Sequence, residues 1–318
     1  MKNNILNIFD LAYGRMSSAS SILLVTHEGT DGDDLGSLLG MMKILETDGK
    51  KVRAAVKGGV PQGLMFLPGF EYVQENVGDL DFDLLITFGC NRIGRVGFDE
   101  LVNFSGEIIN FDHHPDNTNF GKINVVDAST AAVAELVYDF LKYLKKTITK
   151  DIALCLLTGI FTDTGGFKHA NTTAKVLETA ADLMKKGARI EKIAYNTMGQ
   201  KRPSTVKAWA RGLENARFDK QQQLVFSVLT ENDLKEIGAT DEDLEGFVEL
   251  LNHIPQAKFA LLLRQDGDAV KGSLRSEQHK DVDVSKIAKI FGGGGHKLAS
   301  GFKVKGKLIK SGDAWEIQ

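Results

Sequence analysis

Short apolar runs alternate with stretches of helical periodicity over residues 1–190. Apolar runs bounded by turn residues predict buried strands, and apolar residues that recur every three or four positions predict helices. The predicted strands are 22–26, 52–56, 84–88, 108–111 and 123–126. The predicted helices are 5–12, 35–45, 131–144, 150–161 and 173–186. This alternation favours a doubly wound α/β domain with a mostly parallel sheet, in which ligands bind at the carboxyl ends of the strands.

The pattern changes near residue 190, where helical stretches lead into a strand-rich region. The predicted helices there are 190–198, 204–216, 241–254 and 284–291, and the predicted strands are 224–229, 259–263, 269–275 and 299–304. Pro203 disfavours helix at the residue before it, which marks a linker around Lys201–Ser204. We therefore expect a first domain at 1–190, a linker at 191–204 and a second, smaller α/β domain at 205–318.

Composition narrows the class of protein. Of the 318 residues, 42% are hydrophobic and 25% are charged, as in soluble globular proteins. The sequence contains neither an apolar run of about 18 residues nor a secretory signal, so we expect no membrane span. Its two cysteines, Cys90 and Cys155, suggest a reducing compartment, and hence the cytoplasm. A net charge of -3 argues against long duplex DNA as a ligand and leaves short anionic substrates open.

The first candidate site follows the strand 22–26. His27, Asp31, Asp33 and Asp34 lie within eight positions, among glycines that allow tight turns. Imidazole nitrogen together with carboxylate oxygen suits manganese, iron or zinc. The alternative is an acidic turn that caps the next helix, with Asp33 or Asp34 as the N-cap.

Two further clusters follow later elements of the same domain. Asp112, His113 and His114 come directly after the strand 108–111, and Asp163 stands in a Thr-Asp-Thr-Gly turn at a helix end. Each cluster also has a purely structural explanation: the two histidines could be a hydrogen-bonded pair in a turn, and Asp163 could be an ordinary turn residue. Three such clusters of Asp and His in one α/β domain are less easily explained by coincidence, and together they indicate a metal site.

The fourth candidate lies in the second domain. Four glycines, Gly292–Gly295, precede His296 and Lys297, and free backbone N–H groups in such a loop can bind a phosphate. Arg275 ends a predicted strand and could hold a phosphate or stack on a base. The alternatives are a flexible linker for the glycines and an ordinary surface position for Arg275.

These elements, in this order, resemble the DHH/DHHA1 phosphoesterase family, in its nanoRNase/pAp-phosphatase-like branch related to RecJ. The resemblance covers nearly the whole chain. It implies hydrolysis of phosphodiesters or phosphomonoesters on two metals, usually Mn²⁺, which in such sites lie about 3.5–4 Å apart. It also implies a homodimer.

The resemblance implies a role for each motif residue. One metal would be bound by His27 and Asp31, and the other by Asp33, His113 and Asp163. His114 would face the scissile phosphate, with Asp112 orienting a histidine. The terminal phosphate or base of the nucleotide would be held by Arg275, Gly293, Gly294, Gly295 and His296.

The stretch after the strand 84–88 departs from the family pattern. The family carries an Asp there, in a sequence like Val-Leu-Asp-x-x-x-x-x-Arg-x-Gly, and that Asp bridges both metals. Aligned without gaps on Arg95 and Gly97, the Asp position falls on Gly89, which has no side chain to offer.

The first loop departs as well. Thr30 stands where the family usually has Pro, and Asp34 stands where a small residue is common. Three outcomes remain open: Asp34, Cys90 or Asn91 supplies a replacement ligand; the site holds one metal and hydrolyses slowly; or the protein binds nucleotide without cutting it.

The resulting hypothesis is a metal-dependent phosphodiesterase, an exonuclease or oligoribonuclease that acts on short oligonucleotides, linear dinucleotides or pAp. The alternative is a degenerate member that binds nucleotide or a partner protein without catalysis. Inorganic pyrophosphatase is disfavoured, because the glycine-rich second domain matches the nucleotide-handling branch.

Overall fold

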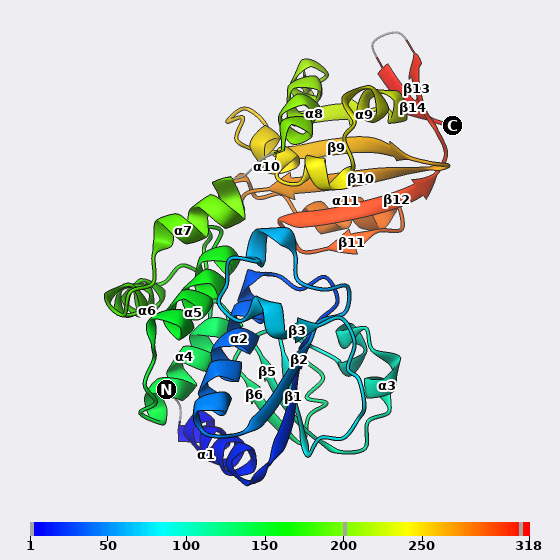
Figure 1. Ribbon diagram of the computed structural model, residues 1–318. Coiled ribbons are helices and arrows are strands. Elements are labelled where there is room, and N and C mark those ends of the chain that lie inside the picture. Colours follow the sequence, from blue (N-terminus) through cyan, green and yellow to red (C-terminus); the bar gives the residue numbers. More distant parts are fainter. Residues whose placement is uncertain (1–2, 200–201, 312–313) are drawn as a thin grey trace. The chain divides into compact units, whose positions relative to one another are not determined.

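Six parallel strands form the sheet of the first of two structural units, which span Met1–Gln200 and Lys201–Gln318 (Figure 1). The computed structural model describes residues 3–199, 202–311 and 314–318. The strands are β1 (Ser21–Thr26), β2 (Lys51–Ala55), β3 (Val73–Gln74), β4 (Leu84–Phe88), β5 (Glu107–Asp112) and β6 (Ile123–Val126). Their order in the sheet is β3-β2-β1-β4-β5-β6. From β1, the chain adds β2 and β3 on one side and then β4, β5 and β6 on the other, so the strand order switches between β1 and β4. A doubly wound sheet binds its ligands at this kind of switch point.

Helices cover both faces of this sheet (Figure 1). One face packs on α1 (Asn3–Ser18), α2 (Gly32–Thr47) and α4 (Val133–Tyr143). Helix α5 (Lys150–Asp163) packs on α2 and α4, and α6 (Ala174–Lys185) packs on α5. The other packs on α3 (Asp99–Val102) and the 3₁₀ turn η3 (Ile93–Val96). Short 3₁₀ turns η1 (Gln62–Leu64) and η2 (Phe70–Tyr72) connect β2 to β3. The central strands β1, β4 and β5 are therefore buried on both sides, which explains their mostly apolar sequences.

Helices α2 and α5 pack closely through glycine. A Cβ atom added to Gly36 would lie 2.3 Å from the carbonyl oxygen of Cys155, so only glycine fits at this crossing. Gly159, one turn further along α5, would place a Cβ 2.7 Å from Oδ1 of Asp33. This close approach brings the start of α2 and the end of α5 together, and both carry candidate site residues.

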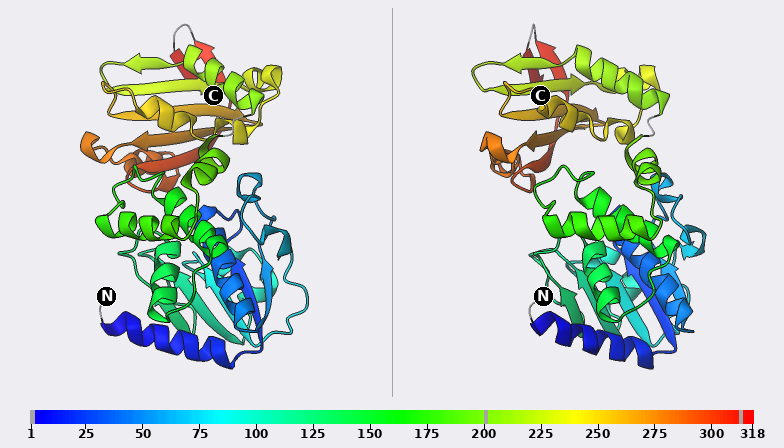
Figure 2. Two further views of the ribbon diagram at one scale, coloured as in Figure 1. Left: turned by 60° about the vertical axis from the view of Figure 1, so that its left-hand side comes forward. Right: turned by 90° about the vertical axis from the view of Figure 1, so that its left-hand side faces the viewer.

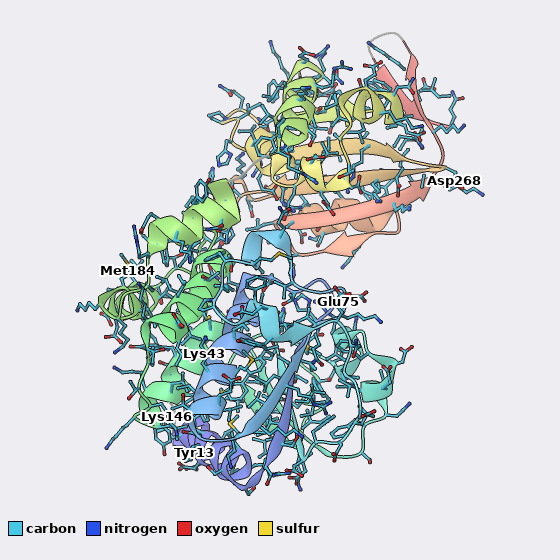
Figure 3. All side chains as sticks on the ribbon, in the orientation of Figure 1. Tyr13, Lys43, Glu75, Lys146, Met184 and Asp268 are labelled. Carbon is cyan, nitrogen blue, oxygen red and sulfur yellow. The ribbon has the colours of Figure 1, made fainter. Side chains whose placement is uncertain are left out.

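Helix α1 is anchored at the opposite end of the unit by mixed contacts. The Nζ atom of Lys146 lies 5.1 Å from the centre of the Tyr13 ring, and both residues are labelled in Figure 3. The same ammonium group donates to Asp48 at 2.6 Å. Among the described residues, no helix is both long and apolar enough to cross a membrane.

The second unit has a sheet of its own with helices on both faces (Figure 2). Its strands are β7 (Arg217–Asp219), β8 (Leu224–Leu229), β9 (Phe259–Asp266), β10 (Ala269–Ser276), β11 (Gly294–Gly295) and β12 (Ala299–Lys305). They lie in the order β11-β12-β10-β9-β8-β7, antiparallel except for the β8–β9 pair. One face packs on α8 (Pro203–Glu214), α9 (Glu231–Ile237) and α10 (Phe247–Asn252), and the other on α11 (Val284–Ile290). A hairpin of β13 (Leu308–Ser311) and β14 (Ala314–Ile317) follows.

Most predicted elements of the second unit are present, with one correction. The helix predicted over 241–254 is wrong as one element: a 3₁₀ turn η5 (Asp241–Leu244) and α10 are separated by Gly246, whose φ is 83°. The predicted linker is helical over most of its length, because α7 (Ile190–Ala194) runs into the π-helix η4 (Tyr195–Gly199) and α8 begins at Pro203. The linker residues Gln200 and Lys201 lie outside the described residues.

Candidate metal centre

The candidate residues of the first unit converge on the carboxyl ends of three neighbouring strands. β1, β4 and β5 are adjacent in the sheet and run in parallel, so the chain segments that follow them lie side by side. His27 follows β1, Gly89 follows β4, and Asp112 is the last residue of β5. Helix α5 brings Asp163 to the same edge from its carboxyl end.

The first cluster consists of His27, Asp31 and Asp34, and is called the His27 cluster below. One ligand atom from each residue lies within 4.8 Å of the others. The Nε2 atom of His27 is 2.8 Å from Oδ2 of Asp34. Asp31 is the N-cap of α2, and its Oδ1 accepts the amide N–H groups of Asp33 and Asp34 at 2.9 and 3.1 Å. The prediction that Asp33 or Asp34 is the N-cap is therefore wrong, because α2 begins at Gly32.

The second cluster consists of Asp33, His113 and Asp163, and is called the His113 cluster below. Its ligand atoms also lie within 4.8 Å of one another. The Nε2 atom of His113 is 3.5 Å from Oδ2 of Asp163. Both carboxylate oxygens of Asp33 accept amide N–H groups at the start of α4, from Val133 at 2.6 Å and from Ala134 at 2.8 Å. A helix N-terminus favours a carboxylate at this place, which holds Asp33 in position.

Negative charge is concentrated in the two clusters. Asp33 and Asp34 are only 2% and 3% exposed. Burial raises the pKa of Asp33, and the charges of Asp163, Asp34 and Asp31 raise it further. Burial likewise raises the pKa of Asp163 to about 6, although His113 opposes the shift. Within the described parts of the chain, no Lys or Arg forms an ion pair with these four aspartates, and a divalent cation would supply the missing positive charge.

Both cluster histidines are oriented as metal ligands usually are. The Nδ1 atom of His27 lies 2.8 Å from the carbonyl oxygen of Glu28, and Nδ1 of His113 lies 3.3 Å from that of Thr130. A backbone carbonyl next to Nδ1 selects the tautomer that carries its proton there and leaves Nε2 as a lone-pair donor. In both residues it is Nε2 that faces the carboxylates, so the donor set fits a divalent metal with mixed nitrogen and oxygen ligands.

His114 lies beside the clusters and is held by Asp112. Its Nδ1 is 2.6 Å from Oδ1 of Asp112, a carboxylate with no exposed side-chain surface. Asn117 donates to the other oxygen of that carboxylate. Burial opposes ionisation of Asp112, but the hydrogen bonds from His114 and Asn117 outweigh it and lower its pKa. The hydrogen bond that His114 donates to Asp112 in turn raises the pKa of His114.

The space in front of Gly89 is filled by Asp34. A Cβ atom added to Gly89 would lie 1.8 Å from Oδ1 and 2.2 Å from Oδ2 of Asp34. The two other candidates for a replacement ligand are engaged elsewhere. The thiol of Cys90 is buried in the core on the other side of the sheet, with its pKa raised by burial. The side chain of Asn91 is tied to Asp116 through its Nδ2, which donates at 2.9 Å, while its buried Oδ1 has no hydrogen-bond partner among the described residues.

Arg275 occupies a pocket of the second unit. The pocket has a volume of about 430 Å³ and is lined by more acidic than basic side chains, including Glu249, Asp241 and Arg264. The Nε atom of Arg275 donates to Oε1 of Glu249 at 2.5 Å, and Nη1 donates to the carbonyl of Leu274 at 2.9 Å. Part of the guanidinium group is thus already paired, and a phosphate would have to compete with Glu249.

The four-glycine segment is part of a hairpin rather than an open loop. Gly294 and Gly295 form β11 and pair with Gly301 and Ser300 of β12. The amide N–H groups of Gly292 and Gly293 donate to the carbonyls of residues 289 and 288, at the end of α11, and that of His296 donates to the carbonyl of residue 299. The expectation that the N–H groups of the four glycines are free is wrong for Gly292 and Gly293. The substrate-binding role of Gly293, Gly294, Gly295 and His296 stays a prediction.

The structure brings together all of the first-domain residues that were expected to bind metal. It adds Asp34 to the His27 cluster and Asn117 to the support of Asp112. Asn117 was missed, although its place in the Pro-Asp-Asn turn after the two histidines was a usable signal. The ligand roles themselves stay predictions.

The fold and the site together define a two-unit α/β protein with two candidate metal clusters at a switch point of its parallel sheet. Residues 21–160 match the N-terminal domain of the DHH family, and residues 221–313 match the DHHA1 domain. The chain belongs to the DHH family and carries a DHHA1 domain.

Two similar proteins extend along nearly the whole chain. The bifunctional oligoribonuclease and PAP phosphatase NrnA of Thermus thermophilus is 35% identical over 286 residues, which cover 90% of this chain and 84% of that protein. An exopolyphosphatase-related protein of Bacteroides fragilis has a crystal structure with a TM-score of 0.87 and 26% identity, covering 95% of this chain and 92% of that one.

The crystal structure of RecJ from Thermus thermophilus in complex with Mn²⁺ shares the fold. Its TM-score is 0.54 at 14% identity, and the match covers 94% of this chain and 52% of that one.

Proposed function

We propose that this protein is a metal-dependent phosphoesterase that hydrolyses short oligonucleotides, linear dinucleotides or pAp to mononucleotides. The observation that carries the proposal is the pair of carboxylate–histidine clusters at one sheet edge, with His114 beside them. The similar Thermus thermophilus protein, named a bifunctional oligoribonuclease and PAP phosphatase, supports this choice of substrates.

The proposed metal ligands are five of the six members of the two clusters. His27 and Asp31 hold one ion, and Asp33, His113 and Asp163 hold the other. When bound, the ions neutralise charge on phosphoryl oxygens and activate a water molecule for attack. The ion we propose is Mn²⁺, because the donors are mixed imidazole and carboxylate and because RecJ was crystallised with Mn²⁺.

His114 contacts the substrate phosphate in this proposal. The hydrogen bond that His114 donates to Asp112 favours the protonated form of His114, which donates a charge-assisted hydrogen bond to a phosphate oxygen. Asp112 is a positioning residue, since its buried carboxylate fixes the imidazole ring from behind. The two amide N–H groups that also donate to Asp112 keep that carboxylate in place.

The second unit contributes substrate binding. Arg275 and His296 interact with the terminal phosphate or the base of the nucleotide. β10 and β12 pair Arg275 with Ala299, whose carbonyl accepts the amide N–H of His296, so both side chains belong to one end of the sheet.

We also propose a cytoplasmic location, in keeping with two free cysteines. We further propose a homodimer, which light scattering after gel filtration tests.

The test uses the full chain, stripped of metal with a chelator and reloaded with Mn²⁺, Mg²⁺ or Co²⁺. We expect release of mononucleotide from 5′-phosphorylated di- to pentanucleotides and of AMP from pAp. The His114→Ala variant and the stripped protein serve as negative controls. Absence of turnover with all three metals and all of these substrates contradicts the proposal.

Gly89 favours a second candidate function, a nucleotide-binding protein without catalysis. Glycine at this position cannot offer the carboxylate that the family pattern places there. This candidate predicts nucleotide binding in calorimetry without any product, whereas turnover by the wild-type protein rules it out.

A further inference from the structure

The carboxylate of Asp34 and the empty side-chain position of Gly89 are complementary. Two carboxylates cannot both occupy this space, because a Cβ at position 89 would already lie 1.8 Å from Oδ1 of Asp34. Gly89 is not free to move aside, since its amide N–H donates to the carbonyl of Phe111 at 2.9 Å. Its φ of +63° further limits the residues that fit there.

Asp34 belongs to one cluster, and its charge acts on members of the other. It is a member of the His27 cluster, with Oδ2 at 2.8 Å from Nε2 of His27. Its charge acts on Asp33 and Asp163, which are members of the His113 cluster. The Asp34 side chain is only 3% exposed and contacts the His27 cluster, so it is not an ordinary surface carboxylate.

We propose that Asp34, from the first turn of α2, supplies the shared carboxylate that the family pattern places at position 89, so that Asp34 and Gly89 are one exchanged pair. The inference rests on the proposed function only in taking the two clusters as metal sites. It resolves the departure at Gly89: the ligand has moved from the segment after β4 to the helix after β1.

The location on α2 has a physical consequence for the ligand. The amide N–H of Asp34 donates to Asp31, and Asp31 is itself a member of the His27 cluster. The two carboxylates are thus fixed relative to each other by the helix N-terminus. A ligand held by a helix is more precisely placed than one held by a loop.

The test compares Mn²⁺ binding by the full-length wild type, Asp34→Asn, Gly89→Asp and the double variant Asp34→Ala/Gly89→Asp. Calorimetry on chelator-stripped protein gives stoichiometry and affinity, and electron paramagnetic resonance distinguishes a coupled Mn²⁺ pair from isolated ions. Glu28→Gln is the matched control, since Glu28 is an exposed carboxylate beside His27 and outside both clusters.

We expect wild type to bind two coupled ions. Asp34→Asn should lose one ion, or bind both about 10–100-fold more weakly, and should lose the coupled signal. The double variant should regain the second ion and the coupling. Gly89→Asp alone should bind Mn²⁺ no more tightly than wild type, because the position in front of residue 89 is already filled.

Metal-free melting temperatures separate a ligand role from a structural one. Asp34→Asn removes one negative charge from a group of neighbouring carboxylates, so the metal-free variant should have a melting temperature no lower than that of wild type. The increase in melting temperature caused by Mn²⁺ should be lost. If the double variant does not fold, Asp34→Asn decides the question alone. Unchanged stoichiometry and coupling in Asp34→Asn, or at least tenfold tighter binding in Gly89→Asp, overturns the inference.

Hydrolysis is scored separately from metal binding. A wild-type protein that binds a coupled pair but releases no product contradicts the proposed function and leaves the exchange intact. A wild-type protein that hydrolyses substrate while Asp34→Asn keeps both ions contradicts the exchange and leaves the function intact.

Discussion

Oδ1 of Asp112 lies 2.6 Å from Nδ1 of His114 and also accepts the amide N–H of His113 at 2.8 Å. One buried carboxylate therefore fixes a side chain and the backbone that carries it. The neighbouring His113 points its Nε2 toward Asp163 instead, so two adjacent histidines have different orientations and different proposed tasks.

Replacement of Asp112 should reduce catalysis more than metal binding. In Asp112→Asn the shape is kept, but His114 loses the carboxylate that orients it, and kcat should fall about 10–100-fold. Initial rates on pAp and Mn²⁺ calorimetry check this together. Glu100→Gln, an exposed change in α3 on the other face of the sheet, should leave both unchanged. Wild-type kcat in Asp112→Asn would show that His114 needs no such support.

The close crossing of α2 and α5 should make Gly36→Ala destabilising. The added methyl group meets the carbonyl of Cys155 at 2.3 Å, and such overpacking costs about 1–3 kcal/mol in free energy of unfolding. Gly14→Ala in α1 meets nothing within 4 Å, so it should be neutral or stabilise by up to about 1 kcal/mol. Urea unfolding of both variants measures the difference, and equal stability of the two argues against the packing.

Metal binding should stabilise the protein by mass action. At a free Mn²⁺ concentration of about 100 times Kd, the gain is about 2.7 kcal/mol, and a chelator should remove it. His113→Ala should lose most of the gain, because it removes a nitrogen ligand of the His113 cluster. His253→Ala, at an exposed helix end, should keep it. Thermal melts with graded Mn²⁺ distinguish the two, and an equal response would remove His113 from the ligand set.

Arg275 should affect substrate binding and not metal binding. Loss of a charge-assisted hydrogen bond to phosphate should raise KM about tenfold or more in Arg275→Ala, with Mn²⁺ affinity unchanged. Glu249→Gln releases the guanidinium group from its present partner and should lower KM. Steady-state kinetics on both variants give the answer. If KM is unchanged in both, the Arg275–Glu249 pair serves the packing of the second unit alone.

The ion pairs at the end of β9 should make the second unit sensitive to acid. Lys303 at 2.8 Å and Lys271 at 3.0 Å lower the pKa of Asp266 to about 2. A lowered carboxylate pKa adds stability that is complete above the unfolded pKa of about 3.9 and is lost as pH falls toward 2.

The variant Asp266→Asn should therefore be less stable than wild type at pH 7, and the gap should close toward pH 2. Asp268, labelled in Figure 3 at the neighbouring turn, forms no ion pair with any described residue, so Asp268→Asn is the control. Denaturant midpoints at several pH values measure the gap. A gap that does not change with pH would contradict the assignment to this ion pair.

Five of the six strands of the first sheet could be predicted because most are short apolar runs separated by helical stretches, whereas the two-residue β3 was missed. Strands β4 and β6 match their predicted bounds, since polar residues or turns flank both. Elements with weaker patterns were missed: β11 consists of two glycines, and α9 is a seven-residue helix that ends at Gly238. Their positions depend on pairing with β12 and on packing across the second sheet, which no local pattern encodes.

Sequence motifs found the site residues but could not describe their contacts. Asp33, His113 and Asp163 were grouped correctly by resemblance, yet the two N–H groups that hold Asp33 come from residues a hundred positions away. The overlap of Asp34 with the space in front of Gly89 involves the first turn of α2 and the segment after β4, and it is visible only in three dimensions. The sequence could not show that Arg275 is paired, because its partner Glu249 lies on another element, α10.

A Cβ at position 89 would lie only 1.8 Å from Oδ1 of Asp34, and this conflict limits how a sequence with Asp34 and Gly89 can evolve. If both positions carry Asp, one carboxylate must be displaced from the site. If both are small, the shared ligand is gone. A passage between the two arrangements by single substitutions therefore crosses an unfavourable intermediate, which is sign epistasis between positions 34 and 89. Members of the family with one arrangement should form a lineage distinct from those with the other. A sequence search that requires Asp in the segment after β4 would then classify proteins with Asp at position 34 as inactive, although they keep the shared ligand.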